Sequence, residues 1–102
     1  MEKEINGRIW DMVYEYVSAN PGDIQTLVKR LWFNAYAENG EVFIESASAH
    51  AVSSRITVKR KLDKVNAGRV YELYKKGAKA KEFTDTTRNS SYWKAIFAQM
   101  GI

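Results

Sequence analysis

The side chains that could support acid–base or metal chemistry are few in this sequence. His50 is the only histidine and lies among small residues in SASAHAVSS, and the chain has no cysteine. A lone histidine is more often a surface or packing residue than a catalyst or ligand, because a site needs partners at geometric spacing. Glu41 and Glu45 are four residues apart, but nothing beside them would separate their proton affinities as acid–base catalysis requires. Because KKGAKAKE also lacks the second glycine and the Lys-Ser/Thr end of a phosphate loop, we expect no enzymatic activity, no metal and no cofactor.

Charge is divided unevenly along the chain. Residues 1–51 carry four basic and eight acidic side chains, a balance of −4, whereas residues 52–102 carry twelve basic and four acidic ones, a balance of +8. Such asymmetry indicates a basic face with a polyanionic partner, and the alternative is that the two halves attract each other within one fold. The basic clusters that could flank a nucleic-acid groove are Lys59, Arg60 and Lys61, followed by Lys75, Lys76, Lys79 and Lys81.

Residues 1–40 read as an acidic helical hairpin. Apolar side chains recur at helical spacing over Glu4–Ala19, and Asn20-Pro21-Gly22 should end this first helix. Asp23 can cap a second helix, which Gly40 would end in a left-handed conformation. We expect Trp10 of the first segment, together with Trp32 and Trp93 farther along the chain, in the core or in a dimer interface.

The connecting segment, residues 41–67, can be read in two ways. A helix over about Ala47–Lys64 would place Val58, Leu62 and Val65 on one face. Alternatively, EVFIES forms a short strand at Val42–Glu45 and pairs with RITVKRKL in a β-hairpin. The helix is the favoured prediction.

Residues 68–102 predict three short helices. RVYELYKK is amphipathic and closes at Gly77, AKAKEFTDTT offers Ala80 and Phe83 as inward positions, and SSYWKAIFAQMG begins at Ser90 or Ser91 as the N-cap. The fold expected for residues 1–102 is therefore a single all-α domain, a bundle of four or five helices, or a mostly α domain with one short β-hairpin.

The stretches LYKKGAKAKEF and SSYWKAI resemble the helix-turn-helix of resolvase- and invertase-type recombinases and small phage regulators. By this resemblance, Gly77 follows the first helix, Phe83 is the buried residue of the second, and Ser90 begins a recognition helix. The side chains at the start of such a helix enter the major groove of DNA. The resemblance thus implies DNA-facing positions at Asn89, Ser91, Tyr92 and either Lys94 or Ala95. Arg88, just before them, is a further candidate nucleic-acid-binding residue.

A second pattern suggests an internal duplication. Gly7–Gly40 and Gly68–Gly101 have equal length and align without a gap, with GRIWDM over GRVYEL. Two copies of one helical motif would leave a groove between them that suits a peptide or a partner helix.

Together these patterns predict a small regulator or accessory factor, typical of a virus or mobile element, that binds double-stranded DNA. The alternative is a protein-interaction module, an adaptor or inhibitor that binds its partner in the groove between the two motifs. A homodimer formed through the acidic hairpin would place two DNA-reading helices on the two half-sites of an operator. The N-terminus is too polar for a signal peptide and no apolar run approaches about 20 residues, so we expect a cytoplasmic protein without a membrane partner.

Overall fold

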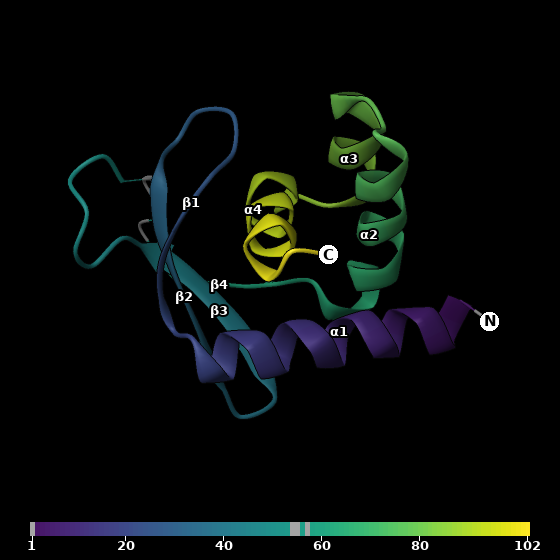
Figure 1. The fold of residues 1–102 in the computed structure, drawn as a ribbon, viewed down its shortest axis with the longest axis horizontal. Coiled ribbons are helices and arrows are strands. Elements are labelled where there is room, and N and C mark those ends of the chain that lie inside the picture. Colours follow the sequence, from purple (N-terminus) through teal and green to yellow (C-terminus); the bar gives the residue numbers. More distant parts are fainter. Residues whose placement is uncertain (1, 54–55, 57) are drawn as a thin grey trace.

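Helices and an antiparallel sheet build the fold in the computed structural model, which describes residues 2–53, 56 and 58–102 (Figure 1). In chain order the elements are α1 (Glu2–Ala19), β1 (Gly22–Gln25), β2 (Trp32–Glu38), β3 (Glu41–Ser46), β4 (Arg60–Lys61), the 3-10 helix η1 (Lys64–Asn66), α2 (Ala67–Lys76), α3 (Ala80–Thr86) and α4 (Ser90–Met100). The sheet order is β1-β2-β3-β4, with each strand antiparallel to the next. The expectations of an all-α bundle and of a mostly α domain with one short β-hairpin are therefore both wrong, because the fold combines helices with a four-stranded sheet.

The segment predicted as the second helix is a pair of strands. In β2, buried Phe33 and Ala35 alternate with half-buried neighbours, and that period of two is what a strand needs to cover one face of a sheet. Asn39 and Gly40 both have positive φ, 51° and 79°, as a tight turn between antiparallel strands requires. Gly40 is left-handed as predicted, but it turns β2 into β3 and does not end a helix.

The middle of the chain follows the alternative prediction in part. No helix forms over Ala47–Lys64 in its described residues; a loop leads instead to β4 and then to η1. β3 pairs with β4 through Phe43 opposite Lys61 and Ile44 opposite Arg60. EVFIES is thus a strand whose partner lies within RITVKRKL, although residues 54, 55 and 57 fall outside the described part of the chain.

The helices predicted at the two ends are confirmed. α1 ends at Ala19, two residues before Pro21, and α2 ends at Lys76, where Gly77 takes the C-cap position with a left-handed φ of 68°. Phe83 of α3 is buried, as expected, whereas Ala80, also predicted to face inward, is exposed. α4 starts at Ser90, and Asn89 takes the N-cap position in place of either serine.

The internal duplication is wrong as a structural repeat. Residues 7–40 hold most of α1 followed by β1 and β2, whereas residues 68–101 hold α2, α3 and α4. The aligned tryptophans show the difference: Trp32 begins a strand, while Trp93 lies inside a helix.

α4 occupies the centre of the molecule, between the sheet and α2 (Figure 1). On one side Tyr92 meets Phe33 of β2 edge to face, with ring centroids 4.9 Å apart. On the other side Phe97 contacts Tyr71 of α2 in the same way, at 5.3 Å. Trp93 is fully buried, so it belongs to the core as predicted, and Trp10 of α1 meets it edge-on. Trp32 alternates with the inward-facing Phe33 and therefore lies half-buried on the opposite face of the sheet.

α1 and α2 cross at a contact that only glycine permits. The Asn6 side chain accepts a hydrogen bond from the Gly68 N–H (2.9 Å) and donates one to the Lys64 carbonyl (3.0 Å). A Cβ atom on Gly68 would lie 2.9 Å from the Asn6 Cα, which is backbone and cannot move aside without displacing α1.

We predict that Gly68→Ala lowers the free energy of unfolding by about 1–3 kcal/mol, because the added methyl group forces the two helices apart. The matched control is Gly7→Ala, on α1, where an added Cβ meets nothing within 4 Å. That change should raise stability by up to about 1 kcal/mol through helix propensity. Urea unfolding of both variants measures the difference, and equal stability of the two would contradict the close crossing.

Candidate nucleic-acid interface

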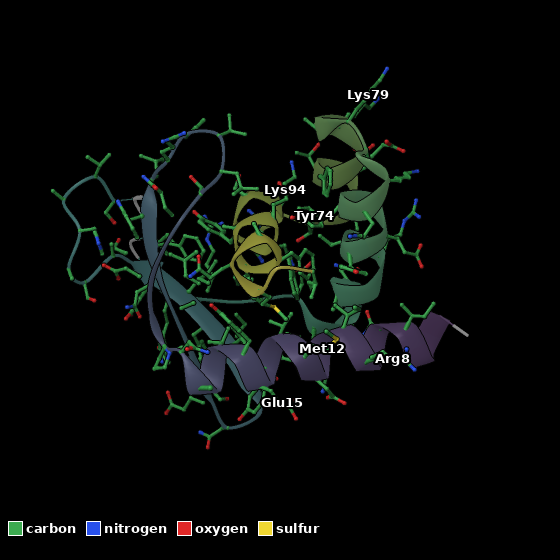
Figure 2. The ribbon with its side chains drawn as sticks, viewed as in Figure 1. Arg8, Met12, Glu15, Tyr74, Lys79 and Lys94 are labelled. Carbon is green, nitrogen blue, oxygen red and sulfur yellow. The ribbon has the colours of Figure 1, made fainter. Side chains whose placement is uncertain are left out.

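The two sides of the molecule differ in their balance of charge. Lys79, at the N-cap of α3, and Lys94 of α4 point to the edge that also carries the β1–β2 loop (Figure 2). α1, on the other side, carries Glu15 together with Arg8, and acidic residues outnumber basic ones in this helix by four to two. That acidic side is formed by α1 and the β2–β3 turn, which contact through a hydrogen bond from the Gly40 N–H to Tyr14 Oη (3.2 Å). We call the first side the basic edge. The segments that reach it are the β1–β2 loop, the end of α2, α3, the α3–α4 connection and the start of α4, and the cations in these segments are Lys29, Arg30, Lys75, Lys76, Lys79, Lys81, Arg88 and Lys94.

The acidic side chains within the basic edge are few. Among residues 75–94 the only acidic side chains are Glu82 and Asp85 of α3. The β1–β2 loop and β2 contain no acidic residue before Glu38. Glu82 is already engaged, since it lies 3.4 Å from Lys76 Nζ and accepts a hydrogen bond from the Lys79 N–H (3.2 Å). The edge therefore presents a positive potential to solvent.

A cleft of about 330 Å³ separates the β1–β2 loop from the start of α4. Apolar and basic side chains share its walls, and Lys29 and Lys94 come from opposite sides. The lining residues are Thr26, Leu27, Val28, Lys29, Leu31, Ser91, Tyr92 and Lys94.

The β1–β2 loop is held in one shape by hydrogen bonds across its neck. The Thr26 N–H donates to the Leu31 carbonyl (2.9 Å), and the Leu31 N–H donates to Thr26 Oγ1 (3.0 Å). Gln25 Nε2 adds a bond to the carbonyl of Arg30 (2.9 Å), whose φ of 53° is left-handed. The loop is thus a fixed projection with Leu27 and Val28 exposed beside two cations.

A buried carboxylate braces the base of this hairpin. The side chain of Asp23 in β1 is only 3% exposed and lies 2.8 Å from His50 Nδ1 through Oδ2. The His50 ring stacks on Trp32, the first residue of β2, with centroids 3.6 Å apart. The other donors to Asp23 are Asn34 Nδ2, the N–H and Oγ of Ser48, and the Ala49 N–H.

These hydrogen bonds decide the charge state of Asp23. Burial of the carboxyl by itself raises its pKa, but the bonds from His50, Ser48, Ala49 and Asn34 outweigh burial and hold the pKa of Asp23 well below its ordinary value. The group is therefore an anion that ties the loop after β3 to the base of the hairpin. The His50 side chain is partly exposed and is engaged by Asp23 and by the Trp32 ring. Among the described residues, no group of three or more His, Asp or Glu side chains could hold a metal ion.

A second carboxylate fixes the start of α4. Asp63 Oδ1 accepts hydrogen bonds from Trp93 Nε1 (2.9 Å) and Asn89 Nδ2 (3.0 Å), and Oδ2 accepts one from Asn66 Nδ2 (2.6 Å). Burial again raises the pKa of Asp63, yet the bonds from Thr87, Asn66, Asn89 and Trp93 keep it below its ordinary value.

The residues predicted to read DNA differ in how far their side chains are exposed. Asn89 is only 7% exposed and bonded to Asp63, so its side chain is not free to reach a base. Tyr92 is half-buried against Phe33. Ser91 is exposed, and Lys94 is half-exposed with its Nζ 4.0 Å from the centre of the Phe83 ring.

The predicted basic clusters are likewise separated. Lys75, Lys76, Lys79 and Lys81 join the basic edge, whereas Lys59, Arg60 and Lys61 lie on or beside β4, at the far end of the sheet from β1. Lys59 Nζ instead lies 4.6 Å from the Phe43 ring centre. Sequence reasoning missed Lys29 and Arg30, which were counted with the acidic half; the available signal was LVKRL between two segments with strand-like alternation.

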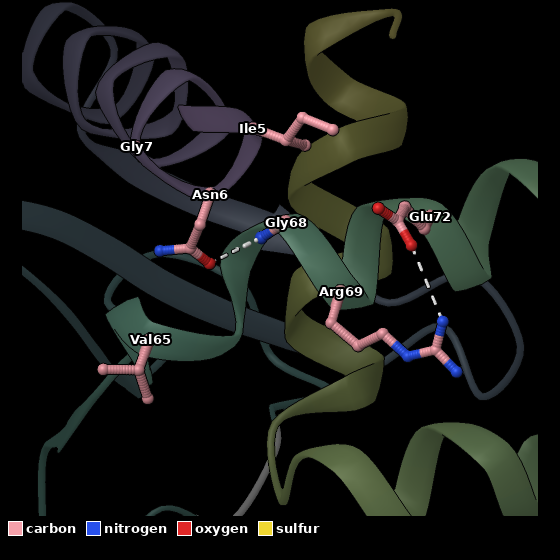
Figure 3. Close-up of a pocket in the computed structure, with 7 residues that line it drawn as sticks. All are labelled: Ile5, Asn6, Gly7, Val65, Gly68, Arg69 and Glu72. Atoms are coloured by element: carbon pink, nitrogen blue, oxygen red, sulfur yellow. Dashed lines mark hydrogen bonds and ion pairs between the residues drawn. The ribbon is translucent and has the colours of Figure 1, made fainter. Parts of the chain in front are cut away.

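A second hollow lies between α1 and α2 (Figure 3). It has a volume of about 490 Å³, and its lining includes Asn6 and Gly68, whose hydrogen bond joins the two helices. Val65, which also lines it, is 81% exposed, and Arg69 and Glu72, three residues apart on α2, pair with each other at 3.6 Å.

Comparison with protein families, with characterised proteins and with solved structures finds no match to this chain. Within the described part of the chain, no helix is both long enough and apolar enough to cross a membrane.

We predict that the free energy of unfolding falls as the pH drops below 3.8, the ordinary pKa of an aspartate. The folded pKa values of Asp23 and Asp63 are depressed, so the unfolded chain binds protons first; the stabilisation is complete above 3.8 and is lost toward the folded values. Asp23→Asn should cost roughly 1–3 kcal/mol at pH 7, because it leaves donors unpaired, and should flatten the acid limb of the curve.

Urea unfolding across acidic and neutral pH measures both effects. Asp85→Asn is the control, since it removes the same charge from an exposed side chain and should change stability at pH 7 by less than about 0.5 kcal/mol. A pH curve for Asp23→Asn that runs parallel to wild type would show that the carboxylate does not brace the hairpin.

Proposed function

We propose that this protein binds double-stranded DNA through its basic edge and acts as a small regulator or accessory factor. The observation that carries the proposal is the collection of cations from the β1–β2 loop, α3 and α4 on one side of the molecule. These elements are distant in sequence, so the fold adds the cations of the β1–β2 loop and of α4 to the local run of lysines at residues 75–81. A duplex carries one negative charge per about 1.7 Å of its axis and is the polyanion that an extended basic edge suits.

The roles of the side chains follow from their positions. Lysine and arginine contact phosphates, which sets the register of the protein on the duplex without reading sequence. Lys29 can do this from the loop, Lys79 from the start of α3, and Lys94 from α4. Ser91, in the first turn of α4, is exposed and is the candidate for a contact to a base edge.

The acidic side, formed by α1 and the β2–β3 turn, would orient the protein on DNA. Its carboxylates are repelled by DNA, so the molecule should approach a duplex with the basic edge leading. A homodimer would present two such edges to neighbouring half-sites. This role would put the protein in the cytoplasm, on a nucleoid or on the DNA of a virus or mobile element.

A second candidate function is peptide binding in the groove between α1 and α2. The exposed apolar side chains Ile5 (42%) and Val65 (81%) on its rim favour this candidate. Capture of a defined partner that is abolished by Val65→Asp, while DNA binding is absent, would establish it in place of the first.

We predict that Lys29→Glu combined with Lys79→Glu weakens binding to a fluorescently labelled duplex by more than tenfold at low salt. The slope of log affinity against log salt should become shallower by about 1.8, since about 0.9 is lost for each phosphate contact removed. Fluorescence anisotropy at low and physiological salt measures both quantities.

The control is Arg8→Glu combined with Lys61→Glu, an identical charge change at exposed positions on α1 and β4. It should leave the salt slope unchanged. An equal loss in both variants would mean that net charge alone drives binding, and no binding by wild type even at low salt would refute the function.

A further inference from the structure

The tip of the β1–β2 loop combines two properties that are usually kept apart on a protein surface. Val28 is 87% exposed and Leu27 is 48% exposed, and they are followed directly by Lys29 and Arg30. Of the large apolar side chains in the described residues, Val28 is the most exposed. Proteins that bend DNA insert apolar side chains of this kind between stacked bases, while neighbouring cations contact the phosphates. The tip of the loop has both kinds of side chain.

The hydrogen bonds across the neck of the loop keep the tip away from the protein's own core. Thr26 is bonded to Leu31 through both its backbone N–H and its hydroxyl group, and Gln25 is bonded to the Arg30 carbonyl. Little ordering of the loop is therefore required when it meets a partner, which favours binding.

The cleft beside the loop sets the geometry of the complex. The minor groove of DNA is about 6 Å wide and the major groove about 12 Å, and one sugar-phosphate strand separates the two. The loop and the start of α4 stand on either side of a cleft of about 330 Å³, with Lys29 on one wall and Lys94 on the other. Its Leu31 and Tyr92 side chains give it an apolar surface suited to deoxyribose.

We propose that this cleft seats one sugar-phosphate strand of a duplex, so that the β1–β2 loop enters the minor groove and the first turns of α4 face the adjacent major groove. Val28 inserts as an apolar wedge at a base step, and Lys29 and Lys94 neutralise phosphates of the seated strand from its two sides. Arg30 lies in the minor groove, whose negative potential is strongest where A·T pairs narrow it. This inference rests on the proposed DNA binding and adds the groove, the inserted residue and a preference for A·T-rich, deformable sequence.

The experiment compares wild type, Val28→Ser and Val65→Ser on A·T-rich and G·C-rich duplexes of about 20 base pairs, by anisotropy and by energy transfer between end labels that reports bending. Wild type should prefer the A·T-rich duplex and bend it, and netropsin, which occupies the minor groove, should displace it. Val28→Ser should lose about tenfold in affinity for the A·T-rich duplex, the value of one buried valine side chain, and should lose the bend. Val65→Ser removes an equally exposed valine from the groove between α1 and α2, and should behave as wild type.

The possible results distinguish the minor-groove inference from the proposed DNA binding on which it rests. Salt-dependent binding that Lys29→Glu weakens, without bending, A·T preference or netropsin competition, would overturn the minor-groove wedge and leave DNA binding intact. Absence of any duplex binding would overturn both. Binding to vesicles of anionic lipid that Val28→Ser abolishes, with DNA binding unaffected by that change, would show that the tip is a membrane wedge and would also overturn the inference.

Discussion

The carboxylate of Asp63 accepts hydrogen bonds from the Trp93 indole and the Asn89 amide, and these bonds fix where α4 begins. The position of α4 in turn determines the rest of the molecule, since the sheet packs on one side of it and α2 on the other. The contact between Tyr92 and Phe33 then sets the distance from α4 to β2, and with it the distance from Lys94 to the β1–β2 loop. A surface proposed to bind DNA is thus held in place by the polar cluster around Asp63.

The predictable parts of the fold are those where periodicity and chain breaks agree. α1 shows helical spacing of apolar residues up to Pro21, and α2 does so up to Gly77, and both ends were predicted correctly. Between Asp23 and Gly40 the two kinds of signal conflict. Ile24, Leu27 and Leu31 have helical spacing, but Leu27 lies exposed on a loop. The stronger signals were the Asn-Gly turn and the alternation of residues 32–37, which favour a hairpin over a helix.

The candidate site was predictable only in part, because it is a product of tertiary structure. Clusters of lysine near α3 are visible in the sequence, and they do lie on the basic edge. Lys29 belongs to a half of the chain whose net charge is negative, and only the antiparallel pairing of β1 with β2 turns the loop toward α4. Asn89 illustrates the reverse case, since an amide at the start of a helix looks like a DNA-reading residue until its burial against Asp63 is seen.

The basic residues of β4 lie on an edge strand of the sheet, which gives them a role apart from nucleic-acid binding. β4 is a strand of two residues, both charged, and its outer side has no neighbouring strand among the described residues. An unpaired strand edge is a template onto which another chain can add, and short length and positive charge are the two features that discourage this. Arg60 and Lys61 therefore give this edge both features, so sheet-to-sheet joining of separate copies is expected to be disfavoured there.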